Sequence, residues 1–192
     1  MKKIALAALV CGITMFVGCK SEEKKDDVEI TQENTDSDAT TAEAQTLTID
    51  FTAKSGTNAS GKATFSEQNG EVTFTANLSG LEPGEHAIHI HEKSDCSAPD
   101  ASSAGGHWNP TFKDHGKWGS ASYHRGDIGN FTVNENGEGT ITMSTSEWCI
   151  GCDDETKNIL GKSVIVHVGA DDFVTQPTGD AGGRAACSAI IR

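Results

Sequence analysis

Residues 86–91 read His-Ala-Ile-His-Ile-His, a short alternating run that holds three of the chain's seven histidines. Successive side chains of a β-strand point to opposite faces, so His89 and His91 share one face of the predicted strand while Ile88 and Ile90 fill the other. The strand therefore offers an apolar face to a core and two imidazoles on its other face. A strand histidine is more often a satisfied core or surface residue than a metal ligand, so the meaning of this pair depends on the other histidines.

The same alternation recurs from residue 46 onward, and long helical periodicity is absent. Asn69-Gly70 and Asn136-Gly137 each separate two alternating runs. Asn-Gly is a strong signal for a tight hairpin turn whose two central residues both take positive φ. The predicted strands span 46–53, 61–67, 71–78, 86–92, 127–134, 138–144, 162–168 and 185–191. We therefore predict an all-β fold, an eight-stranded antiparallel Greek-key barrel or sandwich with a long metal-binding loop.

The N-terminal part of the chain has a different character. Residues 1–18 begin Met-Lys-Lys and continue as an apolar segment too short for a comfortable membrane span, followed directly by Cys19. This pattern resembles a bacterial lipoprotein signal, which predicts cleavage before Cys19 and acylation of that cysteine. An ordinary signal peptide with an incidental cysteine is the alternative. Both interpretations predict export, and the first predicts a lipid anchor in the bacterial cell envelope, at the outer membrane, its periplasmic face or the surface.

Residues 19–45 form a polar stretch between the signal and the domain. From Lys20 on it carries three lysines and nine acidic residues, a net charge of −6. Such a stretch cannot bury enough apolar surface to offset the entropy of ordering it, so we expect a flexible acidic tether.

Residues 46–192 have the size of one domain with a full core. They hold ten of the 15 Lys and Arg residues and nineteen of the 28 Asp and Glu residues, a net charge of −9. A domain of this charge lacks the basic surface that nucleic-acid binding requires. The sequence does not distinguish a monomer from a homodimer. The connection 92–126 is unusually long for a compact domain. Metal and a disulfide can supply its order, because it contains Cys96, His107, His115 and His124.

Four cysteines follow Cys19. An exported chain meets an oxidising environment, and four cysteines allow three pairings. The Cys149-x-x-Cys152 spacing favours a local pair, which leaves Cys96 with Cys187. A redox-active motif is the alternative, but the sequence lacks the βαβ context of a thioredoxin-like site, so a structural clip in a long turn is favoured.

The histidines and one aspartate separate into two ligand sets. The first set comes from two predicted strands and comprises His89, His91 and His167. Nitrogen-rich sets of this kind suit copper. The second set offers three imidazoles and one carboxylate, which suits tetrahedral zinc, and comprises His107, His115, His124 and Asp127. Seven residues can serve two metals if one imidazole bridges them. Asp171 is placed to orient ligand imidazoles by hydrogen bonding.

Specific motifs over about residues 46–192 resemble those of bacterial copper/zinc superoxide dismutases. They are His86-Ala87-Ile88-His89-Ile90-His91-Glu92, Asp95-Cys96, Ala104-Gly105-Gly106-His107-Trp108-Asn109-Pro110, His115-Gly116, His124-Arg125-Gly126-Asp127-Ile128-Gly129-Asn130 and Gly182-Gly183-Arg184-Ala185-Ala186-Cys187. The resemblance implies the β-sandwich architecture of that family. It also implies an enzyme that dismutes superoxide to oxygen and hydrogen peroxide, with copper and zinc as cofactors.

The resemblance further implies a role for each site residue. It implies copper ligands His89, His91, His107 and His167, and zinc ligands His107, His115, His124 and Asp127. His107 would bridge the metals and take part in catalysis, Arg184 would guide the anion above the copper, and Asp171 would link the two sites. The resemblance implies a Cys96–Cys187 disulfide and a purely structural His86. This sequence departs from eukaryotic members in a shorter 171–184 segment that lacks their channel lysine, and the turn with Cys149 and Cys152 is longer than usual.

Two other classes of function remain open at this stage. A protein of the same fold can buffer copper and zinc without turnover, or serve as a degenerate metal chaperone. An adhesive or structural sandwich has no need of the histidine spacing. Degenerate members of the family usually lose ligands or the active-site arginine, and this sequence keeps them all. Metal analysis combined with a superoxide-dismutation assay separates the three.

Overall fold

The computed structural model describes residues 44–192. The strands in this part of the chain are β1 (Gln45–Ala53), β2 (Ser60–Gln68), β3 (Glu71–Ser79), β4 (Gly84–His91), β5 (Gly129–Val133), β6 (Gly139–Thr145), β7 (Ser163–His167) and β8 (Arg184–Ala189). Each pairs antiparallel with its neighbours, and they close into a barrel in the order β1-β2-β3-β6-β5-β4-β7-β8. The predicted all-β antiparallel barrel is confirmed. The predicted signal 1–18, Cys19 and the tether up to residue 43 lie outside the described residues.

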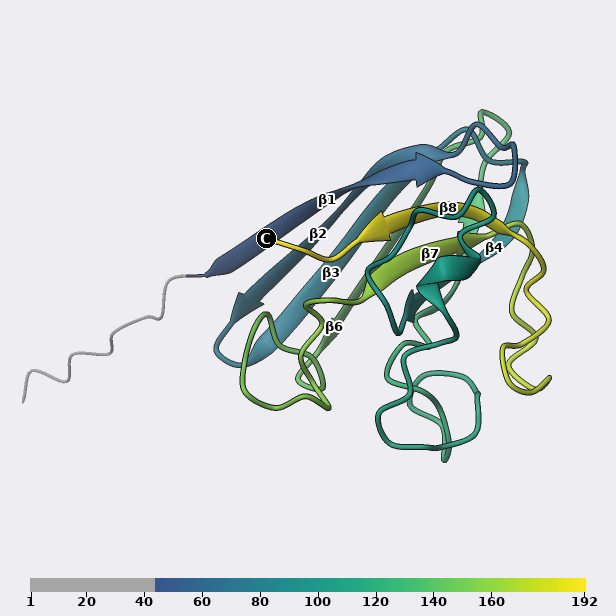
Figure 1. Ribbon diagram of the computed structural model, residues 1–192. Coiled ribbons are helices and arrows are strands. Elements are labelled where there is room, and N and C mark those ends of the chain that lie inside the picture. The colour runs from purple at the N-terminus through teal and green to yellow at the C-terminus, as the bar shows by residue number, and fades with distance from the viewer. Residues whose placement is uncertain (1–43) are drawn as a thin grey trace, which may run out of the picture. The chain divides into compact units, whose positions relative to one another are not determined.

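The strand order contains two connections that pass between non-adjacent strands. β3 is followed in the chain by β4, and β6 by β7, yet neither pair is adjacent in the barrel. Figure 1 shows the long teal connection between β4 and β5 and the yellow segment between β7 and β8 extending from the same side of the strands. These two irregular segments therefore both lie near β4 and β7, the strands that carry the predicted copper ligands.

The barrel core follows the alternation in the sequence. Val72, Phe74 and Ala76 of β3 are fully buried, while the residues between them are partly exposed. β4 is buried on both faces, since Ile88 and Ile90 join the main core while His89 and His91 are covered on the opposite face. A strand buried on both faces needs something to cover its second face, and the irregular segments provide it.

One of the two Asn-Gly turns differs from the prediction. Asn69 and Gly70 both have positive φ, 53° and 77°, as the tight hairpin requires. In the second hairpin only Gly137 has positive φ, and the side chain of Asn134 accepts hydrogen bonds from the backbone of Asn136 and Glu138. The prediction of a two-residue turn there was wrong. The Asn134 carboxamide favours a three-residue loop whose last residue is the left-handed glycine.

The connection between β4 and β5 has one short 3₁₀ helix, η1 (Ser102–Ala104), and is otherwise irregular. Its backbone folds back onto the end of β4, where Trp108 N donates to Ile90 O over 2.8 Å and Ile90 N donates to Gly126 O over 2.9 Å. A side chain at Gly126 would lie 2.1 Å from Ile90 O, so only glycine permits this close approach. No helix in the described part of the chain is long and apolar enough to cross a membrane.

Two disulfides lie in the described residues. Cys96 pairs with Cys187 and joins the long connection to β8, whereas Cys149 pairs with Cys152 inside the turn between β6 and β7. The first bridge spans 91 residues and the second only three. The first therefore ties the irregular connection to the barrel, and the second is local.

Candidate metal centre

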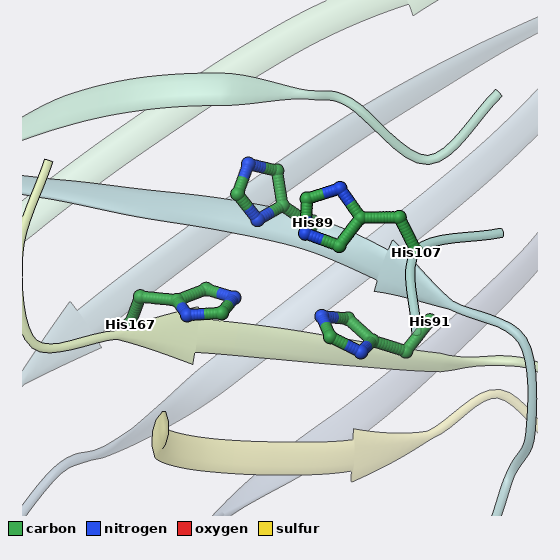
Figure 2. Close-up of side chains that lie close together, drawn as sticks. All are labelled: His89, His91, His107 and His167. Carbon is green, nitrogen blue, oxygen red and sulfur yellow. The ribbon is translucent and has the colours of Figure 1, made fainter. Parts of the chain in front are cut away.

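The four histidines of the predicted copper set converge on one small space. β4 carries His89 and His91, β7 ends at His167, and His107 comes from the connection, where it pairs with His91 in an isolated β-bridge. The ring centroids of His89 and His107 are 4.0 Å apart, and those of His89 and His167 are 4.9 Å apart. Figure 2 shows one nitrogen of each ring directed toward the space between the rings. Such atoms, one from each residue, all lie within 4.8 Å of one another.

The predicted zinc set forms a second cluster around one carboxylate. Asp127 Oδ1 lies 2.8 Å from Nδ1 of His107 and 3.2 Å from Nδ1 of His124, and its Oδ2 lies 3.0 Å from Nδ1 of His115. One ligand atom from each of these four residues again lies within 4.8 Å of the others. All four are buried. Residues up to twenty positions apart in the sequence are thus brought together in one cluster.

His107 is the residue common to both clusters. Its Nδ1 donates to Asp127 Oδ1, and its Nε2 has no hydrogen-bond partner. The two nitrogens of one imidazole point in different directions, so one ring can serve two neighbouring groups. His107 therefore contributes a ring nitrogen to each cluster.

Hydrogen bonds on one nitrogen of each ring leave the other nitrogen free. Nδ1 of His91 donates to Gly105 O over 2.9 Å, and Nε2 of His89 donates to Asp171 Oδ2 over 2.9 Å. In a neutral imidazole the nitrogen that donates carries the only proton, so the opposite nitrogen has a free lone pair. The free atoms are Nε2 of His91 and Nδ1 of His89.

Six buried ring nitrogens within residues 44–192 have no hydrogen-bond partner. They are His89 Nδ1, His91 Nε2, His107 Nε2, His115 Nδ1, His124 Nδ1 and His167 Nε2. Buried polar atoms are nearly always satisfied, and leaving one unpaired costs about 1–3 kcal/mol. All six belong to the two clusters. A bound cation in each cluster would satisfy them, so the donor sets fit metal ions.

Burial keeps three histidines of the predicted copper set neutral. It lowers the pKa of His91 and His167 well below 6.5, and their imidazole neighbours add to the effect. Burial also lowers the pKa of His107 to about 4, against the opposing influence of Asp127. Neutral imidazole is the form that ligates metals, so these three side chains do not have to lose a proton to bind one at neutral pH.

Asp127 supplies the ionised carboxylate of the predicted zinc cluster. Burial opposes ionisation of Asp127, but the hydrogen bond from His107 and the adjacent imidazoles of His115 and His124 hold the pKa of Asp127 far below the usual value. Burial would likewise lower the pKa of His115, yet the neighbouring carboxylates of Asp127 and Asp171 raise it to about 9. In the absence of metal this cluster therefore holds a carboxylate paired with an imidazolium.

Asp171 connects the two clusters. Its Oδ2 accepts from His89 and its Oδ1 accepts from Nε2 of His115, each over 2.9 Å. Its backbone is held by Asn130, whose carboxamide accepts from Asp171 N and donates to Asp171 O, each over 2.8 Å. Asp171 thus makes a hydrogen bond to one histidine of each cluster.

Arg184, at the start of β8, lies beside the copper-type cluster. Its Nη1 and Nη2 donate 2.6 Å hydrogen bonds to the carbonyl oxygens of Ala101 and Gly105. Gly105 O also accepts from His91, so the guanidinium and a predicted copper ligand share one acceptor. Burial lowers the pKa of Arg184, but a guanidinium remains charged at neutral pH.

His86 lies outside both clusters, as expected for a structural residue. Its Nδ1 bonds to His167 O and its Nε2 to Glu82 O, each over 2.8 Å. Both ring nitrogens are thus used within the protein. The side chain fixes the backbone of His167 and has no free nitrogen for a metal.

Several residues that hold the site were not predicted from the sequence. Glu147 accepts a 2.9 Å hydrogen bond from Tyr123 and pairs with Arg125, so one carboxylate holds both neighbours of His124. The buried Trp148 donates from Nε1 to Arg125 O over 2.9 Å. These contacts join segments more than twenty residues apart, and no local pattern signals them. They connect the turn that carries Cys149 to the zinc-type cluster.

Comparison with known proteins places this chain in a family with a metal centre of this kind. The family model for "Copper/zinc superoxide dismutase (SODC)" matches residues 59–190. This chain belongs to the copper/zinc superoxide dismutase family. Membership confirms the family that the motifs suggested and supports superoxide dismutation in general as its chemistry.

Solved structures similar to this chain include other proteins with the family fold. A SOD-like protein from Bacillus subtilis is 30% identical, with a TM-score of 0.67 over 75% of this chain and 97% of its own. A double mutant of a SOD-like protein from Bacillus subtilis, in which both substitutions introduce histidine, is 32% identical, with a TM-score of 0.68 over 76% and 97%. The clock protein EA4 is 33% identical, with a TM-score of 0.66 over 76% and 94%.

Proposed function

We propose that this chain dismutes superoxide to oxygen and hydrogen peroxide at a copper ion, with a zinc ion held beside it. The six unpartnered ring nitrogens carry the proposal, because they form two clusters that meet at His107. His89, His91, His107 and His167 would hold copper, whose nitrogen preference their donor set matches. His107, His115, His124 and Asp127 would hold zinc, which favours four-coordinate sets of imidazole and carboxylate.

The bound copper would supply the one-electron redox chemistry of the reaction. His107 would act as a bridging ligand and as the group that holds a proton at Nε2 during turnover. Its Nδ1 is turned toward Asp127, so the ring is fixed while Nε2 remains free. A ring fixed at one nitrogen can exchange a proton at the other without losing its place, which is what a proton carrier requires.

Arg184 would bind the superoxide anion. Two carbonyl oxygens hold its guanidinium in place, so the positive charge is fixed next to His91 and His167. The domain around it has a net charge of −9, and residues 171–183 contribute three aspartates and no lysine or arginine. Attraction of the anion would therefore be local, since distant charges are screened beyond about 8 Å at physiological salt.

The protein would act in the bacterial cell envelope as a lipoprotein, anchored through acylated Cys19 and separated from the membrane by the acidic tether. A single chain contains both ligand sets, so a monomer suffices for activity and a homodimer is compatible with it. Metal buffering without turnover is the competing function. We do not propose nucleic acid as a partner, because the domain has a net charge of −9.

Metal analysis and a superoxide-dismutation assay on the purified full-length chain test the proposal together. One copper and one zinc per chain with catalysis would support it. Both metals without dismutation would favour a buffering protein, and no metal uptake would remove the basis of both functions.

A further inference from the structure

The zinc-type histidine His115 lies in a part of the connection without helix or strand. Its ring position therefore depends on tertiary contacts, with Asp127 in the connection itself and with residues outside it. The segment between β7 and β8 supplies them, and Gln176 makes the most specific ones. Oε1 of Gln176 accepts from His115 N over 2.8 Å, and Nε2 donates to His115 O over 2.9 Å. One carboxamide thus binds both backbone groups of a single residue.

The rest of residues 171–179 closes around the same histidine. Asp171 accepts from the His115 ring at Nε2. Gly179 packs so closely that a Cβ there would lie 2.7 Å from His115 Nε2 and 1.9 Å from Asp171 Oδ1. Gly179 N donates to Thr175 O over 2.7 Å and closes the segment on itself. The segment is therefore shaped around His115, with Gln176 on the backbone and Asp171 on the ring.

We propose that Gln176 is a positioning residue that sets how tightly the zinc site retains its metal. The inference rests on the proposed zinc site. The hydrogen bond to Asp171 fixes only one point of the His115 ring, about which the side chain could still turn. Fixing the backbone as well determines where Cα and Cβ lie, and so holds Nδ1 3.0 Å from Asp127 Oδ2. Groups that orient metal ligands commonly change metal affinity about 10- to 100-fold when removed.

The chemistry of this contact calls for a carboxamide. The backbone of His115 presents one donor and one acceptor, and a carboxamide presents the complementary pair. An ionised carboxylate has no donor for His115 O, and lysine or arginine has no acceptor for His115 N. Gln176 is itself exposed, so water competes for both bonds. The expected effect is therefore at the lower end of the range, about tenfold.

The test compares two near-isosteric variants of the full-length chain. Gln176→Met keeps the length of the side chain and removes both hydrogen bonds to His115. Thr175→Val is the matched control, because it removes a hydrogen bond to Asp172 in the same segment and leaves His115 untouched. Zinc affinity is measured by competition with a chelator, and the site geometry by the visible absorption of Co²⁺ in place of zinc.

Gln176→Met should weaken zinc binding about tenfold and alter the Co²⁺ spectrum, whereas Thr175→Val should leave both unchanged. A merely structural role would lower the melting temperature of both variants without changing either readout, and that result would overturn the inference. If the unmodified chain binds neither Zn²⁺ nor Co²⁺, the proposed zinc site itself fails. If the unmodified chain binds Zn²⁺ and Co²⁺, and Gln176→Met has the same zinc affinity and Co²⁺ spectrum, only the role of Gln176 is refuted.

Discussion

Nδ1 of His107 donates to Oδ1 of Asp127 over 2.8 Å, while the opposite nitrogen of the same ring faces the copper-type cluster. Among the described residues, His107 is the one that both proposed metals would share as a ligand. His107→Ala should therefore remove the spectroscopic coupling between the sites and leave copper on His89, His91 and His167. Metal content and the Cu²⁺ electron paramagnetic resonance spectrum check this. A spectrum identical to that of the unmodified chain would rule out the bridge.

The two disulfides should contribute unequally to stability. The Cys96–Cys187 bridge closes a loop of 91 residues, which in the chain-entropy model corresponds to roughly 4–5 kcal/mol. Cys187→Ser should cost several kcal/mol, whereas Cys149→Ser with Cys152→Ser should cost much less, because a bridge across three residues restricts the unfolded chain little. Denaturant midpoints of the variants give the order. Greater damage in the double variant would contradict it.

Arg184→Ala should slow turnover by about one order of magnitude, within the range of electrostatic steering, with metal content unchanged. Because the surrounding charge is negative, the rate of the unmodified chain should depend weakly on salt, or rise with salt at low ionic strength. Pulse radiolysis at several ionic strengths measures both effects. A steep fall with added salt would instead assign the steering to lysines of the connection, such as Lys93, Lys113 or Lys117.

Stability of the metal-free chain should fall in acid. The folded-state pKa of His107 is lowered from 6.5 to about 4, and those of His91 and His167 are also lowered, so the unfolded chain binds more protons across this window. Stability from these residues is present above pH 6.5 and is lost as the pH falls toward 4. His115 acts oppositely, because its raised pKa gives stability that is lost as the pH rises through about 9. Urea midpoints of chelator-treated protein should decline on both sides, and a flat acid limb would contradict the assignment.

Cys19→Ala should convert a membrane-associated protein into a soluble exported or unprocessed one. Acylation provides the proposed anchor, and residues 20–45 have no apolar face that could replace it. Partitioning into a detergent phase compares the two forms. Equal partitioning would exclude the lipoprotein interpretation.

The strands were largely predictable because alternation in the sequence directly reflects a two-faced barrel wall. β3 was expected over 71–78 and spans Glu71–Ser79, and β7 was expected over 162–168 and spans Ser163–His167. The hairpin at Asn136-Gly137 is present, but its predicted turn type was wrong because a side-chain contact from Asn134 decides the loop. Such a contact depends on local geometry that an Asn-Gly pair alone does not specify.

The ligand residues could be proposed from residue type and motif, but the residues that hold them could not. Gln176 lies 61 residues from His115, and Glu147 lies 24 residues from Tyr123. Each contact exists only because the barrel brings two irregular segments together. Hydrogen bonds between such segments do not recur at a regular spacing, so they cannot be predicted from a pattern in the sequence.

The most direct measurement of the central claim is the rate of superoxide decay with the chain loaded with copper and zinc, compared with the chain loaded with zinc alone. If His89, His91, His107 and His167 form a catalytic copper site, the first form should remove superoxide catalytically and the second should not. Equal decay with the two forms, at confirmed copper occupancy, would show that the copper bound there is not catalytic and would contradict the proposed activity.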